Sequence, residues 1–203
     1  MTALFYRWEF QQREVYGKEA TVDMARYIAF LRGINISGRN TIAMTALKKE
    51  LEHLGFEEIR TYLNSGNVLF SSDEVDARLL ASRIEAMIKQ RFGLDIPVFV
   101  ISKEGLKDIL HHAPAWWGGE NRQIYDQIIF ILPPATFDDV FREIGEPKEA
   151  LEKIMDYKNA IFWSFIRKDY QKTNWWPRTA SVEVARKLTI RTANTVRKIA
   201  GMD

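Results

Sequence analysis

Cysteine is absent from the 203-residue chain, and so are long apolar runs. Without thiols the protein can form no disulfide, no thiolate metal site and no cysteine nucleophile, which suits a reducing compartment. The longest apolar run, Ile128 to Leu132, is strand-sized, whereas a bilayer span needs roughly 18 to 20 residues. Residues 1–23 also lack the apolar segment of a signal peptide. We therefore predict a cytoplasmic protein without a membrane partner.

A strong excess of charge of one sign is absent too. Lys and Arg number 29 against 27 Asp and Glu, and the net charge of +2 is too small to indicate nucleic acid by itself. The segment 167–198 nevertheless contains nine basic residues and only two acidic ones. Apolar residues make up 46% of the chain and aromatic residues 12%, which is enough for a packed core and excludes global disorder.

Residues 24–102 follow the order β-α-β-β-α-β, which is typical of a split-βαβ unit. The run 27–32 is β-prone, and apolar residues then recur at helical spacing up to Gly55, which predicts a helix. Turn residues at 64–67 separate two β-prone runs and predict a hairpin. The second helix is predicted to bury Leu80, Ile84, Met87 and Ile88. A sheet of this kind buries one face under both helices and leaves the other face open.

Residues 103–203 are predicted to form a second subdomain with basic C-terminal helices. The expected elements are a helix and irregular junction at 103–125, a strand at 128–132, a helix capped by Thr136, hairpin strands at 151–155 and 160–166, and helices at 181–188 and 192–200. The order is β-α-β-β-α-α, because two helices replace the expected last strand. No residue-level repeat relates the two halves.

The predicted fold class is therefore α+β, with two related subdomains, βαββαβ followed by βαββαα. Residues 1–23 are interpreted as a leader that is disordered or results from a mis-started chain. The alternative is an ordered extra element that packs Phe5, Tyr6, Trp8 and Phe10.

Four stretches carry a family resemblance. AFLRGINISGRNTIAM, TYLNSGNVLF, the helix that follows them and TIRTANTVRKI resemble the bacterial family known as domain of unknown function 1697, over about Met24 to Met202. The resemblance implies two ferredoxin-like-related subdomains and no established activity. The chain departs from the family pattern T-x-R-N-W-x-T-V at Thr192 and Ala193, and Asn64 stands where Gln is usual.

The loop after the first strand has the most unusual local chemistry. Its polar side chains are Arg32, Asn35, Arg39 and Asn40, and Gly33 and Gly38 lie between them. Guanidinium groups, amides and free backbone N–H groups just before a helix N-terminus favour an anion. The glycine spacing is similar to a phosphate-binding loop, but Arg39 and Asn40 replace the Lys and the Ser or Thr that a nucleotide hydrolase needs. The alternative is structural: the glycines turn the chain, Asn35 and Asn40 bond to nearby backbone, and Arg32 pairs with an acid.

Four residues outside this loop are further candidates for binding a ligand. Asn64 and Ser65 in the hairpin either present polar groups to a ligand or only satisfy their own turn. We expect this hairpin and the loop after the first strand to lie at opposite ends of the sheet. Arg191 and Asn194 recur at helical spacing with Lys198, which predicts one face of the last helix. In the resulting hypothesis, Arg32 and Arg39 hold an anionic or nucleotide-like ligand, Asn35 and Asn40 orient it, and Arg191 approaches from that helix.

Two other classes of function stay open. Cations of the segment 167–198, interleaved with Tyr170, Trp175 and Trp176, have the composition of an RNA- or DNA-binding surface, to which the open sheet face would add. A protein-interaction scaffold, in which open faces form a homo-oligomer, is the third class. The three histidines lack acidic partners at ligand spacing, so no metal site and no cofactor are expected. Because no nucleophile or base is identifiable, no reaction is assigned.

Overall fold

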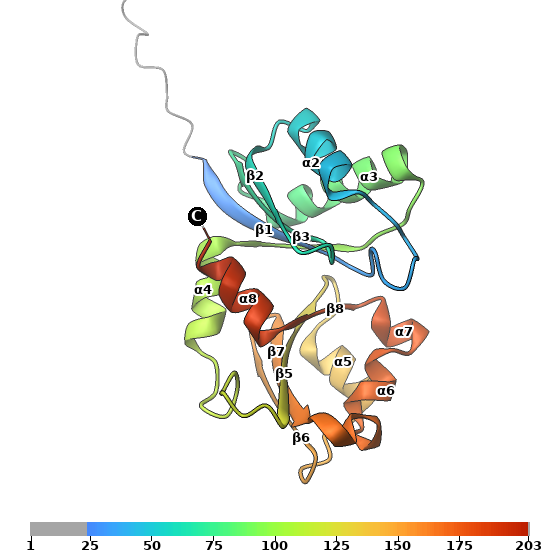
Figure 1. The fold of residues 1–203 in the computed structure, drawn as a ribbon, viewed down its shortest axis with the longest axis vertical. Helices are drawn as coiled ribbons and strands as arrows, with labels where there is room; N and C mark the ends of the chain where they lie inside the picture. The colour runs from blue at the N-terminus through green and yellow to red at the C-terminus, as the bar shows by residue number, and fades with distance from the viewer. Residues whose placement is uncertain (1–23, 203) are drawn as a thin grey trace, which may run out of the picture.

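The computed structural model describes residues 24–202, so the predicted leader at 1–23 lies outside the described part of the chain. The described residues form two four-stranded antiparallel sheets with helices packed on them (Figure 1). This arrangement confirms the predicted α+β class with two sheet-based halves. Every helix in the described part is too short or too polar to traverse a lipid bilayer.

The first half has the predicted order β-α-β-β-α-β. Its strands are β1 (Ala25–Leu31), β2 (Glu57–Tyr62), β3 (Asn67–Ser72) and β4 (Val98–Ser102), and its helices are α2 (Met44–His53) and α3 (Ala77–Phe92). The strands lie in the order β2-β3-β1-β4. Asp76 caps the start of α3 by accepting hydrogen bonds from the N–H groups of its first turn. Gly93 ends this helix with a left-handed φ of 67°.

The second half has the equivalent strand order, β6-β7-β5-β8. Its strands are β5 (Ile124–Ile131), β6 (Glu152–Tyr157), β7 (Ala160–Ile166) and β8 (Leu188–Thr192). Helix α4 (Lys103–His111) follows the first half, α5 (Phe137–Ile144) follows β5, and α8 (Ala193–Ala200) follows β8. Between β7 and β8 lie the 3-10 helix η1 (Arg167–Lys172), α6 (Trp175–Thr179) and α7 (Val182–Ala185). Thr136 caps α5 as predicted, in a capping box with Asp139.

The predicted order βαββαα is wrong at its end, because residues 188–192 form a strand between the two predicted helices. This strand pairs antiparallel with β5, from Leu188 opposite Ile131 to Thr192 opposite Gln127. Three of its five residues are β-branched, which suits a strand packed on a core. The helical spacing of the polar residues misled the sequence interpretation, since tertiary pairing with a sheet edge overrides it.

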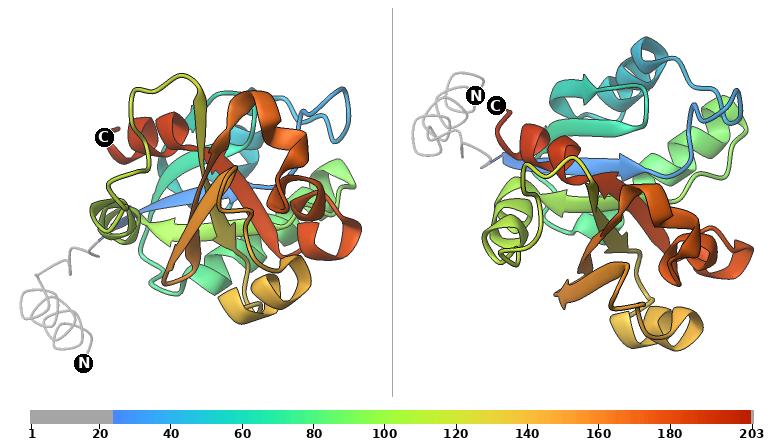
Figure 2. Two further views of the ribbon diagram at one scale, coloured as in Figure 1. Left: turned by 90° about the horizontal axis from the view of Figure 1, so that it is seen from below. Right: turned by 60° about the horizontal axis from the view of Figure 1, so that its bottom comes forward.

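The apolar faces stack in layers. Helices α2 and α3 cover one face of the first sheet, and α5, α6 and α7 cover the outer face of the second sheet. The remaining faces of the two sheets pack against each other, where Phe130 of β5 stacks on Phe30 of β1 and Phe99 of β4 at centroid distances of 4.8 and 5.0 Å. Helices α4 and α8 lie side by side at one flank of this central layer (Figure 2).

The first sheet therefore has no open face, which corrects the prediction that one face stays uncovered. Ile28, Phe30 and Leu69 on that face are all fully buried. The second sheet provides the cover, and burial of apolar area between the sheets stabilises their contact. An RNA- or DNA-binding surface on this face is accordingly excluded.

Candidate functional site

The loop after β1 and the β2–β3 hairpin meet at the same end of the first sheet, so the expectation of opposite ends is wrong. Strand β3 lies between β1 and β2 and is antiparallel to both, so β1 and β2 run in the same direction and their ends share one edge. The N–H of Leu31 donates to the Gly66 carbonyl at 2.8 Å. Asn35 Nδ2 donates to the Asn64 carbonyl, also at 2.8 Å.

The asparagines of this loop bond inside the protein. Asn35 accepts a hydrogen bond from the N–H of Ile42 and donates one to the Ile42 carbonyl, both at 2.9 Å. Asn40 Nδ2 donates to the Gly33 carbonyl at 3.0 Å. Both asparagines adopt a positive φ, which Asn tolerates better than most residues. Their side chains thus shape the loop. In the hairpin, Ser65 Oγ likewise accepts a bond from Asn67 Nδ2 at 3.1 Å.

The arginines of the loop differ from its asparagines. Within residues 24–202, neither Arg32 nor Arg39 forms an ion pair with a carboxylate. Arg39 is exposed, whereas Arg32 is partly buried. The pKa of Arg32 is lowered, first by burial and then by the positive charge of Arg186 beside it. Two neighbouring cations without a carboxylate partner favour an anion near them.

Arg191 lies on strand β8 and not on the last helix, so it shares no helical face with Asn194 or Lys198. Its side chain is buried between the two halves. Nε donates to Asn67 Oδ1 at 2.5 Å, and Nη2 donates to the Leu31 carbonyl at 2.8 Å. The acceptors of its remaining hydrogen bonds are the Ser65 and Gly66 carbonyls, the Ile190 carbonyl and Thr189 Oγ1.

The charge of Arg191 is balanced by dipoles, because no carboxylate of the described residues pairs with it. The guanidinium also lies 5.2 Å from the centre of the Phe30 ring, a cation–π geometry. Burial lowers its pKa to about 10, so the group stays protonated at neutral pH. All five N–H donors are used inside the protein. Arg191 therefore joins the halves and has no donor left for a ligand.

The two tryptophans of the basic segment 167–198 pack into the second half. Trp175 is fully buried and its indole N–H donates to the Gly145 carbonyl at 3.0 Å. Trp176 packs on Trp163 and Phe165 in the outer core of the second sheet. Lys187 pairs with Glu143. These side chains stabilise the fold, and the composition alone did not reveal this.

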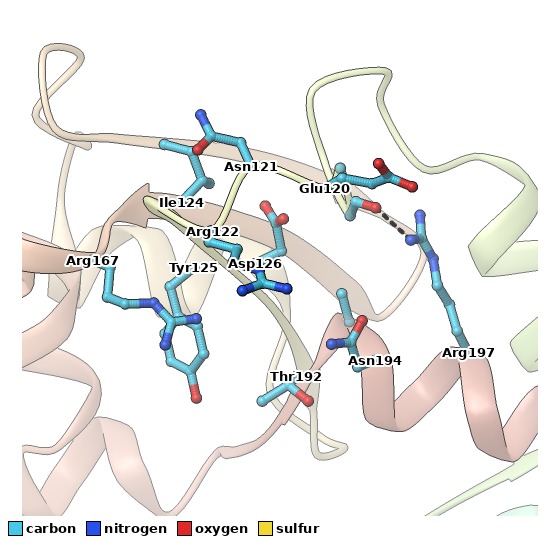
Figure 3. A pocket seen from close by; sticks show the side chains of 13 residues that line it. Glu120, Asn121, Arg122, Ile124, Tyr125, Asp126, Arg167, Thr192, Asn194 and Arg197 are labelled. Atoms are coloured by element: carbon cyan, nitrogen blue, oxygen red, sulfur yellow. Dashed lines mark hydrogen bonds between the residues drawn. The ribbon is translucent and has the colours of Figure 1, made fainter.

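A cavity of about 320 Å³ lies where the start of β5 and the loop before it meet the N-terminus of α8 (Figure 3). Three arginines from distant segments line it: Arg122 from the loop, Arg167 after β7, and Arg197 from α8. Asn194, a residue predicted from the sequence, points from α8 toward the same space (Figure 3). We call the cavity bounded by Arg122, Arg167, Arg197 and Asn194 the arginine pocket.

The three guanidinium groups are held in different ways. Arg167 lies over the ring of Tyr125 at 4.7 Å. Arg197 lies over the ring of Trp117 at 5.2 Å and donates to the Gly118 carbonyl. Within the described residues, Arg122 makes no hydrogen bond or ion pair. It is therefore an unengaged cation at the cavity.

Gly118 is required for the position of Arg197. Its φ is 75°, and a Cβ at this residue would lie 2.2 Å from Arg197 Nη2. Any larger residue would displace the guanidinium or strain the backbone. The glycines of the junction WWGGENR thus allow a side chain of α8 to reach the loop.

The N-terminus of α8 adds backbone donors to the arginine pocket. Thr192 is the N-cap, and its Oγ1 accepts a hydrogen bond from the N–H of Thr195 at 3.2 Å. The first N–H groups of a helix have no acceptor within the helix, and its dipole favours negative charge there. Ala193 and Asn194, which carry two of these groups, line the cavity.

Two carboxylates also line the arginine pocket and reduce its net positive charge. Asp126 is bound by the hydroxyl of Ser164, and Glu120 lies on the exposed loop. Three guanidinium groups thus face two carboxylates, and none of the three arginines is paired with an acid of the described chain. Among residues 24–202 no group of three His, Asp or Glu side chains could hold a metal ion.

Sequence reasoning missed the arginine pocket, although it had noted most of its parts. Arg167 and Arg197 belong to the basic segment, and Arg122 lies in the irregular junction. Nothing in their local sequence indicates that they converge, because 75 residues separate Arg122 from Arg197. The unusual composition of the junction, rich in Gly and Trp, was the feature of the sequence that could have indicated a site there.

The fold and site define an α+β protein of two packed sheets with an arginine-lined cavity in its second half. Residues 24–162 match the model of the family described as protein of unknown function (DUF1697), and the chain belongs to this family. The solved structure of the conserved bacterial protein SP0830 from Streptococcus pneumoniae is similar, with 31% sequence identity and a TM-score of 0.74. The similarity covers 87% of this chain and 97% of that one. No curated protein matches the chain.

Proposed function

We propose that this protein binds a small anionic ligand and that the arginine pocket receives its negative charge. One observation carries the proposal: three guanidinium groups line a single cavity of about 320 Å³, and none pairs with a carboxylate among residues 24–202. Forked donors of this kind match the oxygens of phosphate or carboxylate groups. The free N–H groups at the start of α8 support the same charge preference.

The arginine pocket replaces the loop after β1 as the main site. The asparagines of that loop and Arg191 already use their polar groups inside the protein. Asn194 is retained from the predicted residues, since it lines the cavity. The predicted nucleic-acid surface included an open face of the first sheet, but that face is buried.

A secondary position for an anion is the end of β1. There Arg32 lies close enough to Arg186 for the second charge to lower the pKa of the first. Arg39 lies in the same loop and is exposed. The matching test is Arg32→Met, which should leave affinity unchanged if the arginine pocket holds the ligand.

The substitution Arg122→Met tests the arginine pocket. We expect it to lower the affinity for pyrophosphate about 10-fold or more in calorimetric titration, because one charge-assisted hydrogen bond is lost. Thermal stability should stay unchanged, since Arg122 makes no hydrogen bond or ion pair within the described chain.

Arg60→Met is the control, because Arg60 is an exposed arginine of β2 in the other half and the change removes the same charge. Its affinity for pyrophosphate should equal that of the wild type. Equal losses in both variants would reduce the effect to overall charge and contradict the proposed site. A loss in Arg32→Met alone would move the site to the end of β1.

A further inference from the structure

Gln127 carries a side-chain amide without a hydrogen-bond partner in the described part of the chain, at the edge of a cavity in the second half. It lies on β5 between Trp163 of β7 and Thr192 of β8, and its side chain is on the sheet face covered by α5, α6 and α7. Only 8% of the residue is exposed. Its backbone carbonyl accepts the indole N–H of Trp117 at 2.7 Å. Its side-chain amide, by contrast, forms no hydrogen bond with any residue in 24–202.

A cavity of about 310 Å³ lies beside this amide. Its walls include Gln127, Trp163, Trp176, Thr179 and Thr192. Trp163 is fully buried and packs against Trp176 with ring centres 6.3 Å apart and planes inclined at 39°, so the partly exposed Trp176 supplies the ring surface at the cavity. Both polar atoms of the amide stay accessible at the cavity and are not sealed inside the core. An amide left unpaired in an aromatic cavity is therefore suited to a partner from outside the chain.

The chemistry of the amide defines that partner. A primary amide presents a donor and an acceptor side by side, which matches the hydrogen-bonding edge of a nucleobase. The partly exposed ring of Trp176 next to it provides stacking surface for a planar ring. Among the described residues that line the cavity, Arg191 alone is charged, and its guanidinium is engaged between the halves, so a neutral ring would cover no free charge.

This cavity adjoins the arginine pocket. Thr192 lines both. Tyr125 of the arginine pocket and Gln127 are two residues apart on β5, on the same face and about 7 Å apart by strand geometry. A ligand with an anionic group in one cavity could thus reach the other with a planar ring.

We propose that the ligand is a nucleotide, whose phosphate binds in the arginine pocket and whose base binds against Gln127 and the ring of Trp176. The inference rests on the proposed anion binding and adds the class of the ligand. Gln127 is the residue that recognises the base, through a donor and an acceptor that the protein itself leaves unused.

The test compares ligands with and without a base. The four nucleoside 5′-monophosphates, ribose 5-phosphate and pyrophosphate are each titrated into the wild type, Gln127→Leu and Gln127→Glu. At least one nucleotide should bind the wild type about 10-fold more tightly than ribose 5-phosphate, because the base adds hydrogen bonds and stacking. Both variants should lose this preference. Gln127→Leu should keep its affinity for ribose 5-phosphate, whereas the carboxylate of Gln127→Glu repels every phosphate alike. Gln127→Glu keeps the size of the side chain, so it guards against misfolding of Gln127→Leu.

The outcomes separate the two claims. If ribose 5-phosphate binds the wild type as tightly as every nucleotide, or if both folded variants keep the preference, the base site is wrong and anion binding stands. If neither the phosphates nor pyrophosphate bind, anion binding fails and the nucleotide inference fails with it. Unchanged circular dichroism of at least one variant is the criterion for a folded protein.

Discussion

Arg191→Met is expected to lower the free energy of unfolding by about 3 kcal/mol. The buried guanidinium supplies donors to Asn67 Oδ1 and to the carbonyls of Leu31 and Ser65, all in the other half. Methionine fills the space but leaves these acceptors without that donor. Because a chain of this size loses roughly 2–4 °C per kcal/mol, Tm should fall by roughly 10 °C. Urea unfolding followed by circular dichroism measures the change.

The opposite result is also physically possible for Arg191→Met. A buried charge without a carboxylate partner can cost more than it contributes, and in that case methionine would stabilise the protein. An unchanged or higher unfolding free energy would show that the carbonyl dipoles do not compensate the charge. Arg186→Met is the control, because Arg186 is exposed and its side chain forms no hydrogen bond or ion pair within the described chain. Its stability should stay close to that of the wild type.

Phe130→Ala is expected to destabilise the protein by about 3–5 kcal/mol. Phe130 is fully buried and stacks on Phe30 and Phe99 of the other sheet, so alanine leaves a cavity in the centre of the molecule. Both sheets share this apolar layer, and we expect one cooperative unfolding transition in the wild type and in the variant. Urea unfolding monitored by tryptophan fluorescence and by circular dichroism measures both properties.

Unfolding of one half before the other would contradict this expectation. If the two probes gave two transitions, the sheets would be independent units that only touch. Leu79→Ala is the matched control, since Leu79 on α3 is 47% exposed. Its cost should stay below about 1 kcal/mol.

Much of the fold could be predicted from local pattern. The buried face of α3, the Thr136 cap and the hairpins follow from residue spacing and turn chemistry. Strand β8 could not be predicted in this way, because its pairing with β5 depends on a sheet edge formed by residues far away in the chain. The packing of the second sheet on the first could not be predicted for the same reason, since Phe30 contacts Phe130 only in the tertiary structure.

The candidate site was predictable only in its chemistry. An excess of arginine with asparagine indicated an anion, and Asn194 does line the arginine pocket. The predicted position of the anion site was wrong, because arginine and asparagine also form hydrogen bonds inside the protein. Asn35 and Arg191, for example, donate to backbone carbonyls. Gln127 carried no local signal at all, since a lone glutamine in an apolar strand gives no hint that its amide has no partner.

The most direct test of anion binding is a crystal structure of the protein grown with tungstate, an analogue of phosphate whose anomalous scattering locates it. We predict a strong anomalous peak within hydrogen-bonding distance of the Arg122 guanidinium and close to Arg167 and Arg197 in the arginine pocket. A peak only beside Arg32 and Arg186, or no ordered tungstate at all, would contradict the account.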